Sequence, residues 1–272
     1  MIKFSCLLVS YNQSSFIEYA LDSVFNQDYT EYEIIIADDC SNDGTYQIIR
    51  RYIRSLTFAK RFMLANCYSN SANLGIARNI EKGLSMCSNN AIVMFSGDDI
   101  SLPSRLSRVG NIFEDYPEVR AYSGNIQPID IDNINITWKL NNFRKYGILT
   151  LENYLLDLSF LNQYSFNGCA AAYNLSCVPS LSNKGVNAED IILLFYSFLK
   201  GNVYYDNKVV VKYRVQGNSL SVKNGFIDRL VLVNVWCSIL MELSESKNII
   251  FIYLSMLRLR RFMRFFMLPF LA

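Results

Sequence analysis

Short, continuous apolar runs alternate with stretches of helical periodicity through the first 110 residues, and this alternation restricts the fold more than any other feature. An uninterrupted apolar run of this length is typical of a strand that is covered on both faces. The connections are short, as in βαβ units. The sequence therefore predicts an α/β fold with an open, mostly parallel sheet and helices on both faces. The expected strands are residues 4–10, 32–37, 62–68 and 91–95.

The pattern loosens after residue 120, where strands and helices no longer alternate regularly. Residues 226–272 have the periodicity of two helices and predict a C-terminal helical extension. We therefore expect a main domain over residues 1–225, followed by this extension. The further expected elements are strands at 121–125, 168–173, 202–206 and 209–214 and helices at 151–161 and 189–200.

The composition excludes several classes of function. Histidine is absent from the 272 residues, which removes Ser-His-Asp, Cys-His and histidine-metal chemistry. Any acid or base catalyst must therefore be Asp, Glu, Lys, Tyr or Cys. The formal net charge of +2 gives no reason to expect nucleic acid as a partner. Seven cysteines without CxxC spacing argue against a zinc site and favour a reducing cytoplasm.

Two pairs of aspartates, Asp38-Asp39 and Asp98-Asp99, follow apolar strands at matching positions. The carboxyl ends of neighbouring parallel strands meet at the crevice where open α/β sheets bind ligands. Adjacent carboxylates resist joint ionisation unless a cation or a hydrogen-bond donor lies between them. A divalent metal that holds a substrate phosphate would meet this need at the second pair. The alternative for either pair alone is that the aspartates cap helices or turns.

The common phosphate-binding loops are missing from the sequence. No GxGxxG follows the first strand, and the chain contains no GxxxxGK[ST]. A phosphate-containing ligand would then have to be held by metal, arginine and loop groups. Arg78 is one candidate, and its alternative interpretation is a solvated helix residue.

Four motifs occur in the order and spacing of the GT-A family 2 glycosyltransferases, which the chain resembles closely over residues 3–110. The resemblance continues more weakly through residues 188–193 and 213–221. Each motif alone is moderately specific, whereas four in register are not expected by chance. The motifs are Val9-Ser10-Tyr11-Asn12, Asp38-Asp39-Cys40-Ser41-Asn42-Asp43-Gly44-Thr45, Asn73-Leu74-Gly75-Ile76-Ala77-Arg78-Asn79 and Gly97-Asp98-Asp99-Ile100-Ser101-Leu102-Pro103-Ser104-Arg105-Leu106.

The resemblance implies an inverting transfer from a nucleotide-diphosphate sugar in a GT-A domain. Residues 1–110 would form the nucleotide-sugar half, and residues 111–225 the acceptor-binding and catalytic half. Asp39 would accept a hydrogen bond from the imide N–H of a uracil or thymine ring, with Tyr11 beside the base, which favours UDP. Arg78 would lie near the base or the diphosphate, where a planar guanidinium suits both stacking and phosphate contacts.

The resemblance also implies a divalent metal cofactor, Mn²⁺ or Mg²⁺. Asp99 would coordinate the metal directly, and Asp98 would be held towards the ribose or a metal-bound water. The metal would neutralise the charge that develops on the departing diphosphate. Many relatives carry an additional Asp two positions before the pair, and the chain departs from that pattern with Ser96.

Asp190 matches the catalytic base of the family, and it follows Glu189 at the start of an apolar helix. It would remove the proton from the acceptor hydroxyl. The alternative is that both acids only complement the helix dipole. Arg214 resembles the late basic residue of the family near the diphosphate, and the usual neighbouring histidine is replaced by Gln216.

Residues 249–271 combine an apolar, aromatic background with four arginines. A basic amphipathic helix of this kind can lie in a membrane interface, and the alternatives are packing on the catalytic domain and a homodimer interface. No segment meets the requirement of ~20 residues for a membrane span. With no signal-peptide pattern at the amino terminus, we expect a cytoplasmic protein in peripheral contact with the inner face of the cytoplasmic membrane.

The favoured interpretation is a metal-dependent glycosyltransferase that extends a glycan or lipid-linked oligosaccharide in the biosynthesis of a bacterial surface polysaccharide, such as an O-antigen. A nucleotidyltransferase is less favoured, because residues 11–16 contain neither the glycine nor the lysine of its phosphate loop. A third hypothesis is a catalytically degenerate member that serves as a nucleotide-binding assembly subunit. Ser96 and Gln216 favour this hypothesis, whereas the retained aspartates argue against it.

Overall fold

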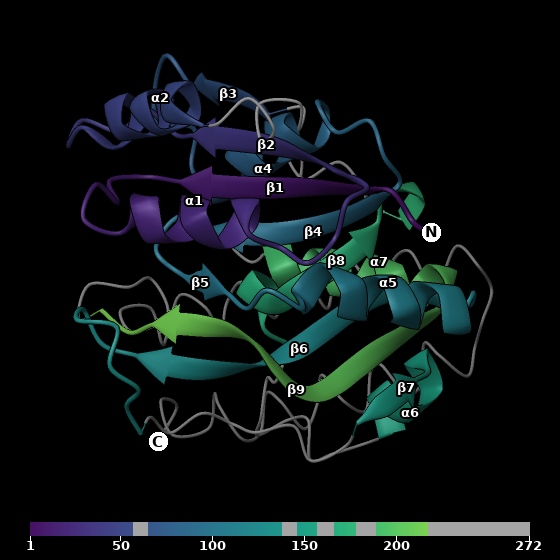
Figure 1. Cartoon of the computed structure of the whole chain (residues 1–272). Coiled ribbons are helices and arrows are strands. Elements are labelled where there is room, and N and C mark those ends of the chain that lie inside the picture. Colours follow the sequence, from purple (N-terminus) through teal and green to yellow (C-terminus); the bar gives the residue numbers. More distant parts are fainter. Residues whose placement is uncertain (57–64, 138–145, 157–165, 178–188, 217–272) are drawn as a thin grey trace, which may run out of the picture.

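The computed structural model describes residues 1–56, 65–137, 146–156, 166–177 and 189–216. The expected C-terminal extension, residues 226–272, lies outside these ranges, and so does the expected membrane-contact segment, residues 249–271. The described residues form a mixed β-sheet with helices on both faces, which confirms the predicted α/β class (Figure 1).

The strands are β1 (Phe4–Ser10), β2 (Tyr32–Asp38), β3 (Ala65–Ser69), β4 (Ala91–Ser96), β5 (Ile100–Ser101), β6 (Val119–Ile129), β7 (Gly147–Leu149), β8 (Ala171–Asn174) and β9 (Asn202–Arg214). Their order is β3-β2-β1-β4-β8-β6-β9-β5, and β7 pairs with β9. Strands β3, β2, β1 and β4 run parallel to one another, as predicted. The second half is mixed, because β8 is antiparallel to both β4 and β6, while β6 and β9 are parallel. Strands β5 and β7 are each antiparallel to β9.

The α-helices are α1 (Ile17–Phe25), α2 (Thr45–Ser55), α4 (Ile76–Leu84), α5 (Arg105–Asp115), α6 (Leu151–Leu156) and α7 (Glu189–Lys200), with the 3₁₀ turns η2 (Gly168–Ala170) and η3 (Leu175–Cys177). Helices α1, α2 and α5 contribute to a hydrophobic core on one face of the sheet. Helices α4, α6 and α7 contribute to a second core on the other face (Figure 1). The sheet is therefore the middle layer of three.

Strand β1 shows why these runs are mostly apolar. Successive residues of a strand point to opposite faces, so Cys6 and Leu8 enter one core while Leu7 enters the other. Burial on both faces leaves no position of the strand for a solvated side chain. Helix α4 approaches the strand closely, since a Cβ atom at Gly83 would lie 2.5 Å from Leu7 Cδ1.

Three sequence predictions in the second half were wrong in their bounds. The strand expected at 121–125 extends over Val119–Ile129 as β6. Residues 202–206 and 209–214 form one continuous strand, β9, and the expected strand at 168–173 begins with the turn η2. Asp206, in the middle of β9, is buried and accepts hydrogen bonds from Arg108 and from the Tyr122 hydroxyl. These long-range contacts stabilise the polar middle of β9, where the sequence alone predicts that one strand ends and another begins.

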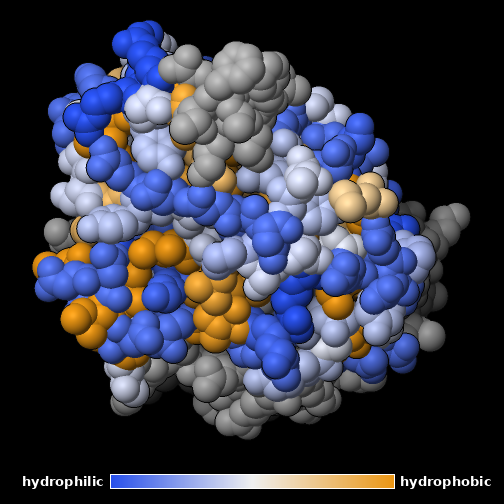
Figure 2. All heavy atoms as spheres, viewed as in Figure 1, coloured by the Kyte–Doolittle hydropathy of each residue, from blue (hydrophilic) through white to orange (hydrophobic). Residues whose placement is uncertain are grey.

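The surface in Figure 2 is mostly hydrophilic, and its apolar side chains gather between α1 and the ends of β6 and β9. The loop that follows β6 contributes two exposed residues, Ile131 and Ile134. Within the described ranges, every helix is too short or too polar to cross a bilayer.

Candidate active site

The loop after β1 and the turn after β2 are tied together by hydrogen bonds. The Asn12 N–H donates to Ser41 Oγ at 2.9 Å, and the Asn42 N–H donates to Asn12 Oδ1 at 3.0 Å. The Ser14 N–H donates to Asp43 Oδ2 at 2.9 Å. Two neighbouring strand exits are thereby joined into one polar surface.

Asp38 is a structural residue of this turn. Its fully buried carboxylate accepts hydrogen bonds from the Ser41 N–H at 3.0 Å and from the Ser69 hydroxyl at 2.7 Å. The Ser10 hydroxyl donates to the same group at 3.2 Å. All of these partners lie at the ends of β1, β2 and β3, so Asp38 joins the three strand ends.

Asp39 fixes the loop that leads into α4. Its Oδ1 accepts hydrogen bonds from the Leu74 N–H at 2.8 Å and from Asn70 Nδ2 at 2.9 Å. Its Oδ2 accepts one from the Gly75 N–H at 2.9 Å. A carboxylate has about four acceptor positions, so roughly one remains for a ligand.

Tyr11 and Arg78 lie at the same edge of the sheet as Asp39. The Asp39 N–H donates to the carbonyl of Ser10 at 2.9 Å, directly beside Tyr11, whose side chain is exposed. Arg78 is exposed in the first turn of α4, close in the chain to the Gly75 N–H that Asp39 holds. The structure therefore brings the three predicted nucleotide contacts to one edge.

The second acid pair follows β4 at this edge. The Gly97 N–H donates to the carbonyl of Val9 at 2.9 Å, which places Asp98 and Asp99 next to the exit of β1. A Cβ atom at Gly97 would lie 2.3 Å from Gln13 Oε1. The turn can run this close to the loop after β1 because residue 97 has no side chain.

The end of β9 holds both carboxylates of the second pair. The Arg214 N–H donates to Asp99 Oδ1 at 2.8 Å, and Gln216 Nε2 donates to Asp98 Oδ2 at 3.1 Å. Gln216 stands where the family usually has a histidine, and it contacts the acid turn directly.

The Arg214 side chain is committed to the protein itself. Its Nε donates to the carbonyl of Asp98 at 2.8 Å, and its Nη1 donates to the carbonyl of Asp130 at 2.7 Å. Its Nη2 donates to Asn133 Oδ1 at 2.5 Å, and the guanidinium lies 4.3 Å from the centre of the Phe16 ring. Arg214 is 1% exposed, so it supports the acid turn from behind, and its predicted contact with a diphosphate would require a rearrangement.

Burial disfavours the charged forms of both acids in the pair. It raises the pKa of Asp98, and it raises the pKa of Asp99 well above its usual value, with the Asp98 charge acting in the same direction. The hydrogen bond from the Arg214 N–H and the charge of Arg214 oppose the shift of the Asp99 pKa only in part. A cation at this position would relieve the repulsion between the carboxylates.

The turn η2 connects the acid pair to the predicted base. A Cβ atom at Gly168 would lie 3.0 Å from Asp190 Cβ and 3.3 Å from Asp190 Oδ2. Burial and then the charge of Asp99 raise the pKa of the next residue, Cys169, so its thiol lies near Asp99. Consecutive residues of η2 thus lie beside Asp190 and Asp99, although the two aspartates are far apart in the sequence.

Glu189 and Tyr173 complete the surroundings of Asp190. Burial and the neighbouring Asp190 charge raise the pKa of Glu189 to about 7. Burial, followed by the Asp190 and Glu189 charges, raises the pKa of Tyr173 well above its usual value. The two neighbouring carboxyls therefore resist being ionised together near neutral pH.

The described residues include no group of three or more His, Cys, Asp or Glu side chains placed to hold a metal ion. Asp98 and Asp99 alone fit a metal that arrives with its substrate, because Mg²⁺ is often held by one or two carboxylates together with substrate phosphates. The raised pKa values of both carboxyls agree with a pair that requires a cation to be fully ionised.

Sequence reasoning missed the role of η2. Gly168 and Cys169 were expected in a strand, and only their position in the tertiary structure brings them to Asp190 and Asp99. The available signal was the glycine itself, since an isolated glycine in a strand pattern often marks a close approach of another group.

Solved glycosyltransferase structures have a similar fold. A structure of residues 1–349 of TarS from Staphylococcus aureus, in complex with UDP-GlcNAc, has a TM-score of 0.67 at 18% identity and covers 88% of this chain and 67% of that chain. The mannosyltransferase PcManGT from Pyrobaculum calidifontis, in complex with GDP-Man and Mn²⁺, has a TM-score of 0.66 at 18% identity and covers 88% and 64%. At this identity the likeness shows the fold, and it confirms the predicted GT-A class.

Relatives in sequence match shorter segments. The poly(ribitol-phosphate) beta-N-acetylglucosaminyltransferase TarS of Staphylococcus aureus is 35% identical over 82 residues, which are 29% of this chain. The cholesterol galactosyltransferase of Borreliella burgdorferi is 28% identical over 97 residues, which are 36% of this chain. The matches span only 14% and 25% of these two relatives.

The family model for glycosyl transferase family 2 matches residues 5–173, which is more than half of the chain. The match contains both acid pairs and the η2 turn, and it ends before Asp190. By this match, the chain belongs to glycosyl transferase family 2.

Proposed function

We propose that this protein is an inverting glycosyltransferase that moves a sugar from a nucleotide-diphosphate sugar to a hydroxyl group of a glycan or lipid-linked oligosaccharide. The observation that carries the proposal is the η2 turn, in which Gly168 lies beside Asp190 and the next residue, Cys169, lies near Asp99. A single displacement needs a base and a leaving-group site on opposite sides of one sugar carbon. The two groups must therefore lie close together, as they do around η2.

The donor nucleotide would lie over the ends of β1 and β2 and the start of α4. Asp39 has an acceptor position left for the imide N–H of a pyrimidine, and the exposed ring of Tyr11 would lie beside the base. The exposed guanidinium of Arg78 would contact the base or the diphosphate. UDP is the preferred nucleotide on this basis, and dTDP presents the same imide edge.

Asp99 would hold a Mn²⁺ or Mg²⁺ ion that arrives with the diphosphate, with Asp98 beside it. When bound, the cation supplies positive charge that stabilises the departing diphosphate. The Arg214 N–H and the Gln216 amide keep the two carboxylates oriented, and Ser96 contributes no third carboxylate.

Asp190 would accept the proton of the acceptor hydroxyl while the hydroxyl oxygen bonds to the anomeric carbon. The bond from that carbon to the diphosphate oxygen breaks in the same step, and its electron pair leaves with the diphosphate. Attack from the opposite face inverts the configuration. Glu189 lies next to Asp190, and its raised pKa lets it take up a proton near neutral pH in place of a second full negative charge beside the base.

We place this reaction in the biosynthesis of a bacterial surface polysaccharide, at the inner face of the cytoplasmic membrane. Residues 249–271 would provide a peripheral contact through their arginines and apolar side chains. A protein that ends at Asn248 should then fail to sediment with anionic liposomes. Retention on the liposomes would assign the contact to another surface.

The test of the base compares Asp190→Asn with the wild type and with Asp115→Asn, a matched exposed aspartate at the end of α5. UDP release from UDP-GlcNAc and other UDP-sugars gives the rate, and calorimetric titration of UDP with Mn²⁺ gives the affinity. Asp190→Asn should lower the rate by about 10²–10⁴-fold, the usual contribution of a general base. The UDP affinity of both variants should stay at the wild-type value.

A parallel loss of UDP affinity in Asp190→Asn would contradict the base assignment. A folded wild-type protein that binds UDP but releases none from any UDP-, dTDP- or GDP-sugar would favour the degenerate assembly subunit instead.

A further inference from the structure

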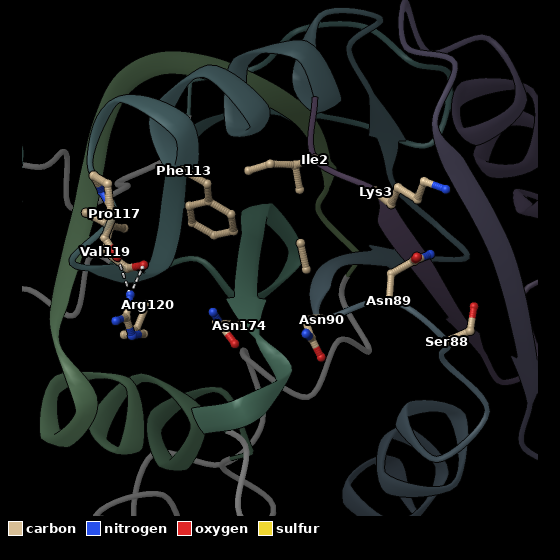
Figure 3. Close-up of a pocket in the computed structure, with 11 residues that line it drawn as sticks. Ile2, Lys3, Ser88, Asn89, Asn90, Phe113, Pro117, Val119, Arg120 and Asn174 are labelled. Atoms are coloured by element: carbon tan, nitrogen blue, oxygen red, sulfur yellow. Dashed lines mark hydrogen bonds between the residues drawn. The ribbon is translucent and has the colours of Figure 1, made fainter.

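A cavity of about 410 Å³ opens at the edge of the sheet opposite to the acids (Figure 3). It lies at the beginnings of β1, β4 and β6 and at the end of the antiparallel strand β8. The seven residues of β1 span roughly 23 Å at about 3.3 Å per residue, and this length separates the cavity from the acid pairs. The cavity is therefore a separate place on the molecule.

The walls of the cavity combine an apolar side and an amide side. Figure 3 shows the Phe113 ring and Ile2 along one side, with Asn90 and Asn174 along the other. The volume lies in the range of small-molecule pockets. Apolar contact on one side and amide groups on the other suit a sugar ring, which has apolar faces and hydroxyl groups at its edge.

Arg120 supplies a positive charge at one end of the cavity. Its Nη1 donates to the carbonyls of Pro117 at 2.5 Å and Val119 at 3.2 Å, as Figure 3 shows. Its stem passes Gly201, where a Cβ atom would lie only 2.7 Å from Arg120 Cγ. None of the ion pairs between described residues includes Arg120, so its remaining guanidinium donors are available to a ligand.

The other charges near the cavity are already paired. The Lys3 ammonium lies 3.9 Å from a carboxylate oxygen of Glu31, and the amino group of Met1 lies 3.0 Å from Glu114. No carboxylate is among the residues that line the cavity within the described ranges. Lys3 lies on the opposite side of the cavity from Arg120 (Figure 3), so the charge beside Asn174 is that of Arg120.

Asn174 and Asn90 add hydrogen-bonding groups beside this charge. Asn174 Oδ1 accepts hydrogen bonds from the Ser176 N–H at 3.1 Å and from the Ser176 hydroxyl at 2.7 Å, so its amide nitrogen is left to donate. The Asn90 carbonyl accepts a hydrogen bond from the Leu175 N–H at 2.6 Å, which fixes its backbone while its side chain stays exposed. The cavity thus offers donors next to a cation.

We propose that this cavity binds one anionic sugar residue of a saccharide, with its carboxylate or phosphate on Arg120 and its hydroxyls on Asn90 and Asn174. A charged hydrogen bond from a guanidinium is stronger than a neutral one, so the anionic group gives most of the selectivity. The site goes beyond the proposed transfer reaction and does not depend on it. A saccharide held here leaves the acid edge free.

The test is a ligand-observed NMR titration of the full chain with glucuronate, glucose 6-phosphate, glucose and inorganic phosphate. The variants are Asn90→Asp, which adds a negative charge in an exposed side chain, and Arg120→Gln. The matched controls are Asn207→Asp and Arg50→Gln, both exposed and outside the cavity. UDP titration of each variant checks that the opposite edge is unchanged.

Glucuronate or glucose 6-phosphate should bind about tenfold more tightly than glucose and than inorganic phosphate, and the tighter of the two identifies the anionic group. Both cavity variants should weaken that binding by about tenfold or more, while both controls leave it unchanged. If glucose binds as tightly as the anionic sugars, the charge of Arg120 has no role in binding. If inorganic phosphate binds as tightly as they do, the cavity does not recognise a sugar ring. Unchanged binding in Asn90→Asp, whose fold is intact by its UDP titration, would overturn the site.

Discussion

Glu189 gives the protein a pH-dependent stability that one substitution should remove. Folding buries this carboxyl beside Asp190 and raises its pKa from the ordinary 4.5 to about 7. Between these two values the folded protein keeps a proton that the unfolded chain has released. The free energy of unfolding therefore falls as the pH rises through this window.

The magnitude follows from the width of the window. At roughly 1.4 kcal/mol per pKa unit, the raised pKa contributes about 3 kcal/mol of stability that is fully present below pH 4.5 and lost above about pH 7. Glu189→Gln is neutral at every pH and removes this contribution. Asp190→Asn removes the neighbouring charge, so it should lower the Glu189 pKa and narrow the window.

Urea unfolding at pH 5 and at pH 8 measures the effect. The wild type should lose about 2–3 kcal/mol more between these pH values than Glu189→Gln does, because part of the window lies below pH 5. Glu152→Gln, an exposed glutamate in the first turn of α6, is the matched control and should keep the wild-type dependence. If Glu189→Gln shows the same loss of stability as the wild type, the carboxyl does not hold its proton in the folded protein and the reasoning is refuted.

Three further substitutions test other contacts. In Gly168→Ala the added methyl group should push against Asp190 and lower the UDP-sugar turnover by about tenfold, since a small misplacement of a catalytic group is costly. The UDP affinity measured by calorimetry should not change. Unchanged turnover would show that the position of Gly168 beside Asp190 does not matter for catalysis. Gly97→Ala should destabilise the protein by about 1–3 kcal/mol in urea unfolding, because the added methyl group overpacks the turn. The control is Gly110→Ala in α5, where a Cβ atom would have no neighbour nearer than 3.3 Å and the stability should not fall. Equal stability of the two variants would contradict this prediction. Arg214→Lys should cost about 2–4 kcal/mol in the same assay through lost hydrogen bonds, and a smaller loss would show that they contribute little.

The first four strands and their helices were predictable because their signal is local. A strand covered on both faces is mostly apolar, as the middles of β1 and β2 are, and its few polar side chains pair with each other, as Ser5 and Glu33 do. The continuity of β9 was not predictable, because it depends on Arg108 and Tyr122, which reach Asp206 from distant elements. Tertiary contacts of this kind leave no local pattern.

In the candidate site, too, some features were predictable from local sequence and others depended on tertiary contacts. The strand-end positions of Asp39 and Asp99 followed from the alternation of strands and helices, and the structure places both there. The commitment of the Arg214 guanidinium to backbone carbonyls could not be read from the sequence, because the partners Asp98 and Asp130 lie 116 and 84 residues earlier in the chain. The sequence identifies which residues carry chemistry, but packing decides which of them support the others.

The contact between Gln216 and Asp98 has a practical consequence for shortened proteins. Gln216 is the last residue before the 56 that follow it to the end of the chain, and its side chain lies on the acid turn. A protein cut directly after this residue would end in an α-carboxylate, which is negative at neutral pH. That new terminus would add a further negative charge near Asp98 and Asp99, and it would compete with any diphosphate for the same cation. A loss of activity after such a cut would then report the position of the new chain end as well as the missing segment, and a cut protein with an amidated terminus would separate the two causes.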